Sequence, residues 1–228
     1  MDFSGLPDRL VLIRETISAG QRAGGWTHPV EIVAVTKGHG PAAVRAAVDA
    51  GLKVVGENRV QEALAKQEAV GSLPVRWHLV GALQRNKARQ AVGRFALIHS
   101  VDRFDLAQEI SRRLAPSSRQ PVLVQVNCSN EAQKGGVEPA GLPGLLEQIA
   151  GLPGLDVGGL MTMAAVDADL GEQHRTFGWL RQLRDQAMAG GRCGPELSMG
   201  MSGDYRVAVE EGATMVRLGT LLLGERSP

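Results

Sequence analysis

The chain has 228 residues, a formal net charge of +1 and two cysteines. This length suits one large domain, and the near-neutral charge excludes a general attraction to nucleic acid or to an anionic membrane. The two cysteines lack metal-ligand spacing, and neither a signal-peptide pattern nor an apolar run of membrane-spanning length is present. These features predict a cytoplasmic protein in a reducing compartment, without a bound metal.

An amphipathic helix is expected over about residues 6–23, and beyond it short apolar runs alternate with stretches of helical period. The apolar runs are nearly continuous rather than alternating, which is typical of strands covered on both faces. We expect strands at 32–37, 53–58, 75–81, 96–102, 122–128, 155–163, 196–202 and 214–219. We expect further helices at 41–51, 59–71, 103–115, 138–151, 171–190 and 203–213.

Eight strand–helix units predict parallel strands joined by crossover helices. A closed (β/α)8 barrel and an open doubly wound sheet both fit that pattern. Eight units in one stretch favour the barrel. We therefore expect a single (β/α)8 TIM-type barrel domain over residues 1–228, with the helix at 6–23 as an extra N-terminal helix.

The first candidate functional residue is Lys37, at the end of the first expected strand. Functional groups of such barrels gather at the carboxyl ends of the strands. By the period of two, Lys37 shares a face with Val33 and Val35, which would place it at the barrel mouth. Partial desolvation there would lower the pKa of the amine and favour its attack on an aldehyde. A lysine that merely reaches solvent is the competing interpretation.

Two loops with small residues follow the seventh and eighth expected strands. The first contains Ser202 and Gly203 at the expected start of a helix, and the second contains Gly219 and Thr220. Barrels of this kind commonly hold phosphate in these two loops, by backbone N–H groups and hydroxyls. A phosphate site and an amine at one mouth predict a phosphorylated aldehyde. Pyridoxal 5′-phosphate and a sugar phosphate handled by a lysine aldolase both remain open.

Three further polar residues lie in or at the end of expected strands. Asn58 ends the second strand, and His78 lies inside the third, where a core histidine is the more common finding. Arg217 is a fixed charge within an apolar strand and must be paired or face a ligand. It would lie beside a pyridine nitrogen, or form a buried ion pair, for which Glu57 is the candidate partner.

Taken together, the chain resembles the pyridoxal phosphate homeostasis proteins, over nearly its whole length. The stretches that carry the resemblance are "VAVTK", "GENRVQEALAK", "WHLVGALQRNKAR", "HSVDR", "VNCSNEAQKGG", "GLMTM", "LSMGMSGD" and "TMVRLGTLLLG". The resemblance implies a barrel of the alanine racemase N-terminal type that holds pyridoxal 5′-phosphate as a Schiff base. Lys37 matches the Schiff-base lysine, and Lys134 matches a family lysine in the loop after the fifth strand. The positions that match the family's cofactor-binding residues are Lys37, Asn58, His78, Ser202, Gly203, Arg217, Gly219 and Thr220.

The same resemblance implies a carrier rather than an enzyme, with apoenzymes that depend on pyridoxal phosphate as recipients, and a monomer or weak dimer. Racemisation needs a second acid or base on the opposite face of the substrate. The only tyrosine is Tyr205, and the chain ends nine residues after Gly219, which leaves no room for the second domain of the racemases. A small racemase-like enzyme is the alternative.

Overall fold

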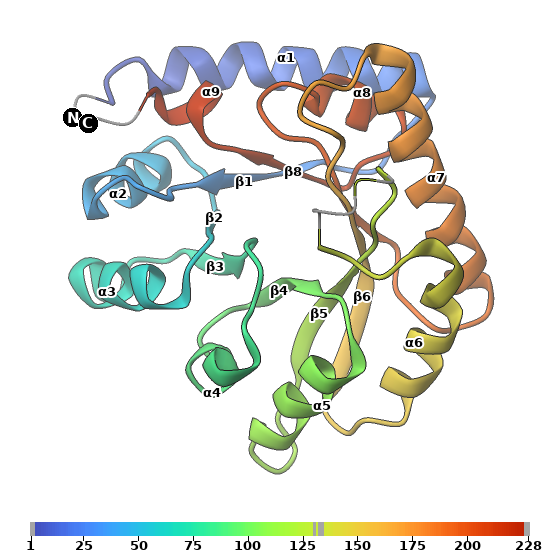
Figure 1. The fold of residues 1–228 in the computed structure, drawn as a ribbon. Helices are drawn as coiled ribbons and strands as arrows, with labels where there is room; N and C mark the ends of the chain where they lie inside the picture. The colour runs from blue at the N-terminus through green and yellow to red at the C-terminus, as the bar shows by residue number, and fades with distance from the viewer. Residues whose placement is uncertain (1–2, 130, 132–134, 226–228) are drawn as a thin grey trace.

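Eight parallel strands close into one barrel in the computed structural model, which describes residues 3–129, 131 and 135–225. Each strand pairs with its neighbours in the chain, and β1 pairs with β8 to complete the ring. The helices lie on the outside of the strands (Figure 1). The predicted (β/α)8 TIM-type barrel with an N-terminal helix is therefore confirmed. In the described residues no helix is long and apolar enough to cross a membrane.

The elements follow the predicted order, with strand ends that differ by a few residues. The strands are β1 (Glu31–Val35), β2 (Val54–Glu57), β3 (Arg76–Leu79), β4 (Leu97–Val101), β5 (Gln120–Gln125), β6 (Leu155–Met161), β7 (Glu196–Ser198) and β8 (Met215–Leu218). The helices are α1 (Leu6–Gly24), α2 (Pro41–Asp49), α3 (Val60–Val70), η1 (Arg85–Lys87), α4 (Ala88–Ala91), α5 (Phe104–Arg113), η2 (Pro139–Gly141), α6 (Leu142–Ala150), α7 (Leu170–Ala189), α8 (Tyr205–Glu210) and α9 (Thr220–Leu223).

The strands bury both faces, as their continuous apolar runs predict. One compact cluster in the barrel interior consists of Val33, Val54, Leu97, Leu123, Met161 and Met215. Alternate strand residues such as Ile32 and Ala34 belong instead to the larger cluster shared with the helices. This division follows from the period of two, because successive side chains of a strand point to opposite faces.

Every strand ends earlier than predicted, and the ends of β1 and β7 shape the barrel mouth. β1 ends at Val35, so that Lys37 lies in a turn, and β7 ends at Ser198. Gly200 adopts a φ of 89°, a left-handed conformation that interrupts extended backbone. The next helix, α8, consequently begins at Tyr205 rather than near Gly203, and the residues between form a loop.

Helix α1 packs along α8 and α9, on the outside of β8 (Figure 1). The Arg9 Nε group donates a hydrogen bond of 2.8 Å to the carbonyl of Leu222, and Trp26 Nε1 donates one of 2.8 Å to the carbonyl of Glu210. These bonds join the beginning of the chain to its last two helices, α8 and α9.

Candidate functional site

Lys37 lies in the turn that directly follows β1, with an exposed side chain. It makes no hydrogen bond or ion pair within the described part of the chain. The expectation that the amine is partly desolvated is therefore wrong, because β1 ends two residues too early to carry the side chain into the interior. The exposed amine is accessible to a ligand that enters the mouth.

A buried network of ion pairs, centred on Lys66, lies beneath this turn and is hydrogen-bonded to its backbone. Lys66, on α3, places its Nζ 2.6 Å from Glu57 Oε1 and 2.9 Å from Glu62 Oε1. The same ammonium group donates to the carbonyl of Thr36, 2.7 Å away, and Glu62 accepts the N–H of Gly38 at 2.7 Å. The residues on both sides of Lys37 are thus tied to Lys66 or its partners, which restricts the backbone that carries the free amine.

Glu57 is fully buried at the end of β2, and the two oxygens of its carboxylate differ in their hydrogen bonding. Oε1 accepts hydrogen bonds from Lys66 and from the Thr36 hydroxyl, whereas Oε2 has no partner among the described residues. Burial raises the pKa of Glu57, and the hydrogen bonds from Lys66 and Thr36 oppose that rise. An unpaired buried oxygen costs free energy, which the hydrogen bonds and the ion pair at Oε1 must offset.

Arg217 points its guanidinium into the barrel interior, where it is hydrogen-bonded, and the carboxylate of Asp204 acts on it electrostatically. Its NH1 donates to Ser198 Oγ at 2.7 Å, and its NH2 donates to the carbonyl of Thr162 at 2.9 Å. Burial lowers the pKa of Arg217 to about 10, so the side chain stays charged at neutral pH. The predicted ion pair with Glu57 is wrong, because Glu57 pairs with Lys66 on the other side of its strand.

Two neutral histidines extend this hydrogen-bonded chain across the barrel. His99 Nδ1 lies 2.8 Å from Ser198 Oγ, and His99 Nε2 lies 3.0 Å from His78 Nδ1. Burial lowers the pKa of His78 to about 3, with a further contribution from Arg76. Burial lowers the pKa of His99 well below its usual value, and the electrostatic interactions with His78 and with the charged Arg217 act in the same direction. The four side chains form a fixed relay that orients Arg217.

The loops after β7 and β8 lie side by side at the mouth. The N–H of Leu221 donates a 3.3 Å hydrogen bond to Ser202 Oγ and so joins the two loops. Four backbone N–H groups of these loops have no acceptor in the described part of the chain, namely those of Ser202, Gly203, Gly219 and Thr220. Unpaired backbone N–H groups in successive loop residues are the kind of donor that can bind an anion.

The loop after β8 adjoins the turn that carries Lys37. β8 and β1 are hydrogen-bonded neighbours, with Leu218 opposite Ala34. A Cβ placed on Gly219 would lie 3.4 Å from the carbonyl oxygen of Val35, two residues before Lys37. Ring closure thus brings the first and last strands of the barrel together, and with them the free amine and the unpaired N–H groups.

The remaining predicted residues, Asn58, His78 and Lys134, do not all lie at the barrel mouth. Asn58 follows β2 at the mouth, half-buried, and its backbone packs so closely on Gly81 that a Cβ there would lie 2.3 Å from the Asn58 carbonyl oxygen. His78 lines a cavity of about 800 Å³ at the opposite, amino-terminal end of the barrel. It therefore reaches the residues of the mouth only through His99. Lys134 lies outside the described residues.

The sequence-based reasoning did not identify Lys66, His99 or Ser198 as parts of the site. Lys66 was expected on the charged, solvent-facing side of its helix, but it lies on the buried face of α3 with Ala63, where a lysine needs a partner. His99 and Ser198 are polar residues within apolar strands, the same signal that drew attention to Arg217. Their pairing depends on the strand register, which the local pattern does not contain.

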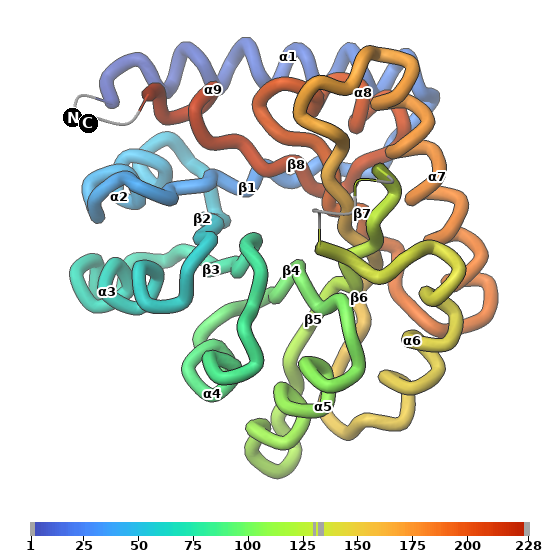
Figure 2. The backbone as a smooth tube through the Cα atoms, viewed as in Figure 1, coloured from blue at the N-terminus to red at the C-terminus, as the bar shows by residue number. Residues whose placement is uncertain are grey.

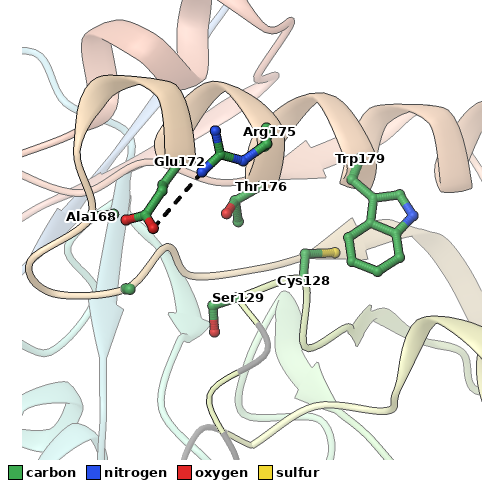
Figure 3. Close-up of a pocket in the computed structure, with 8 residues that line it drawn as sticks. Cys128, Ser129, Ala168, Glu172, Arg175, Thr176 and Trp179 are labelled. Carbon is green, nitrogen blue, oxygen red and sulfur yellow. Dashed lines mark ion pairs between the residues drawn. The ribbon is translucent and has the colours of Figure 1, made fainter.

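A smaller pocket of about 260 Å³ lies between the end of β5 and the first turns of α7 (Figure 3). Cys128 and Ser129 line one side of it, and Thr176 and Trp179 the other. Burial raises the pKa of the Cys128 thiol to about 12, which makes this cysteine unreactive at neutral pH. Lys37 does not line this pocket.

Comparisons with known proteins identify the family. The family model described as alanine racemase, N-terminal domain, matches residues 19–227. A pyridoxal phosphate homeostasis protein of Aquifex aeolicus is 44% identical over 222 residues, which cover 96% of this chain and 97% of the relative. The chain belongs to the pyridoxal phosphate homeostasis protein family.

Solved structures with the same fold include one with pyridoxal phosphate bound and several alanine racemases. PipY of Synechococcus elongatus, a structure with pyridoxal phosphate bound, is 36% identical with a TM-score of 0.84, and the match covers 96% of this chain and all of PipY. Alanine racemase of Bacillus anthracis has a TM-score of 0.69 at 20% identity, and the match covers 97% of this chain but 57% of the racemase. The match to PipY extends over nearly the whole of both chains. The match to the racemase shows only that part of the racemase has the same fold.

Proposed function

We propose that this protein binds pyridoxal 5′-phosphate as a reversible Schiff base on Lys37, keeps free cofactor low and passes it to apoenzymes. The observation that carries the proposal is that the free amine of Lys37 and four unpaired backbone N–H groups lie near one another, at the ends of neighbouring strands. A primary amine attaches an aldehyde, and backbone N–H groups bind a phosphate. The relatives supply the cofactor's identity, since PipY was solved with pyridoxal phosphate.

The residues present fit this cofactor. Lys37 is the exposed lysine of the site, whereas Lys66 is buried and holds two carboxylates, so it cannot compete for the aldehyde. Ser202 adds a hydroxyl to the N–H groups, and its oxygen is already oriented by Leu221. Arg217 supplies a fixed positive charge from the interior, held by Ser198 and Thr162. Asn58 adds a neutral hydrogen-bonding group at the mouth.

Several features favour a carrier over a racemase. When bound, pyridoxal phosphate supplies an electron sink, but racemisation also needs a second acid or base opposite the lysine. Tyr205, the only tyrosine, packs half-buried against the hydrophobic core, on the helix after β7. The histidines of the relay have pKa values far below neutrality and lie inside the barrel. None of these groups is an acid or base that stands free opposite Lys37.

The test is the visible absorption spectrum of the purified protein before and after borohydride reduction, followed by mass mapping of the reduced adduct. We expect a yellow protein whose adduct lies on the peptide that contains Lys37. Lys37→Ala should abolish the adduct, and Lys53→Ala, which removes an exposed lysine at the other end of the barrel, should leave it unchanged.

Other outcomes would replace the proposal. A protein that stays colourless with added pyridoxal phosphate would point to the sugar-phosphate alternative. Steady turnover of an amino acid by the pure protein, abolished in Lys37→Ala, would point to the racemase-like enzyme.

A further inference from the structure

A groove on the outside of the barrel lies between η1 and α5 and has a volume of about 670 Å³. Helices α4 and α5 lie next to one another there, as Figure 2 shows. The groove is lined by Gln84, Arg85, Asn86, Arg103, Glu109, Arg112 and Arg113. Four of these seven side chains are arginines, and none is aromatic.

Two of the four arginines are already neutralised. Arg113 NH2 lies 2.6 Å from Glu109 Oε1, and Arg103 bonds Asp102 at 2.7 Å and Asp105 at 3.0 Å. Arg85 and Arg112 are exposed and have no ion pair within the described residues. Hydrogen bonding from Arg113, aided by the charges of Arg112 and Arg85, lowers the pKa of Glu109. All three arginines therefore act electrostatically on the same carboxylate.

The charge of the chain is concentrated in this region. Residues 84–113 contain seven lysines and arginines against three aspartates and glutamates, whereas the whole chain has a net charge of only +1. The rest of the protein is therefore slightly acidic. Such a local asymmetry steers a complementary partner to one face of a surface.

The groove begins at the barrel mouth. Arg103 stands two residues after the last residue of β4, at the carboxyl end where the candidate site lies. α5 then runs back along the barrel and carries Arg112 about 14 Å away from the rim, at a rise of 1.5 Å per residue. A partner in the groove would thus extend from the mouth down the side of the barrel.

The chemistry of the lining favours carboxylates over phosphates. A nucleic-acid surface combines basic groups with aromatic side chains for base stacking, and the lining contains none. A phosphate would be drawn to the N-terminus of α5, but Asp102 and Asp105 flank that end and pair with Arg103. Two separate, unpaired guanidinium groups suit the carboxylates of an acidic polypeptide, which they bind in a bidentate manner.

We propose that this arginine groove docks a short acidic segment of a recipient protein and holds that protein beside the barrel mouth. The inference rests on the proposed function, because a carrier must bring its cargo close to the recipient. Beyond the proposed function, the inference specifies which face of the barrel binds the recipient and that the contact is between arginines and carboxylates. Direct contact through this groove would raise the local concentration of the recipient near Lys37.

The test uses the holo-protein and a fluorescein-labelled oligoglutamate peptide, measured by fluorescence anisotropy at low and moderate salt. Arg85→Glu/Arg112→Glu should weaken binding by about tenfold or more, with most of the wild-type affinity lost on adding salt. The matched control is Arg22→Glu/Arg119→Glu, which makes the same charge change at two exposed arginines elsewhere. The control should bind within about twofold of wild type.

Equal losses in the two double variants would overturn the groove as the docking site. Tighter binding of tripolyphosphate or of a single-stranded oligonucleotide than of oligoglutamate would overturn the carboxylate assignment. The neutral variant Arg85→Ser/Arg112→Gln guards against misfolding and should lose affinity in the same direction. The borohydride adduct on Lys37, measured in each variant, reports separately on the proposed function and should not change.

Discussion

Lys66 Nζ lies 2.6 Å from Glu57 Oε1, in a buried ion pair that also holds the carbonyl of Thr36, the residue before Lys37. The pair joins α3 to the end of β2 and to the turn after β1. Charges taken out of water are costly to bury and stabilise a fold only while they stay paired. The pair therefore couples the position of the candidate Schiff-base lysine to the integrity of two neighbouring βα units.

Lys66→Met should destabilise the protein by about 3–5 kcal/mol, because it leaves Glu57 buried without its partner. The double variant Lys66→Met/Glu57→Gln should recover much of that loss, since no charge remains buried. Urea unfolding of both single variants and the double variant measures the coupling. Strictly additive effects of the two substitutions would contradict a direct interaction.

Ser202→Ala should weaken binding of pyridoxal phosphate by about 1–3 kcal/mol, as expected for the loss of a hydrogen bond to a charged group. The substitution also removes the acceptor of the Leu221 N–H, which joins the two loops of the proposed phosphate site. Fluorescence titration with the cofactor measures the effect, and Ser72→Ala provides an exposed serine control. An unchanged affinity would remove Ser202 from the phosphate site.

Acid should destabilise the folded protein through the buried relay. The folded pKa of His78 is about 3, below the unfolded value near 6.5, so the unfolded state binds more protons between these limits. Stability from this group is present above pH 6.5 and falls as the pH is lowered, by up to about 1.4 kcal/mol per unit.

The variant His78→Gln isolates this contribution from that of the carboxylates. Its free energy of unfolding should decrease less than that of wild type between pH 6.5 and 5, measured by urea unfolding at each pH. Parallel curves for the two proteins would show that His78 is protonated to the same extent in both states.

Gly200→Ala should be strongly destabilising, by about 2 kcal/mol or more. Its φ is 89°, and a Cβ there would lie 2.6 Å from the Cβ of Ala208 and 2.9 Å from the Cα of Tyr205. The matched substitution is Gly203→Ala in the same loop, where a Cβ would meet nothing within 4 Å. Thermal unfolding should separate the two variants clearly. If both lower the midpoint equally, the loop geometry after β7 is not the cause.

Most of the fold could be predicted from local patterns. Continuous β-branched runs identified all eight strands, because strands of a barrel bury both faces. The regular alternation of these strands with stretches of helical periodicity then favoured a closed barrel over an open sheet. The strand ends were less accurate, as at β1 and β7, where a single turn or one glycine in a left-handed conformation decides where the ladder stops.

The candidate site was predictable only in part. The sequence by itself determined which chemical groups stand near strand ends, namely Lys37, Ser202 and the small residues beside Gly203 and Gly219. It also marked Arg217 as a charge that needs partners. It did so because these signals depend only on residue type and position along the chain.

Only the tertiary structure decided which groups meet. Barrel closure sets β8 against β1 and so brings the unpaired N–H groups beside the lysine turn. The strand register joins His78 to His99, and the packing of α3 assigns Glu57 to Lys66 rather than to Arg217. The physical reason is that contacts between distant segments depend on closure, register and helix packing, which a local hydrophobic period does not encode.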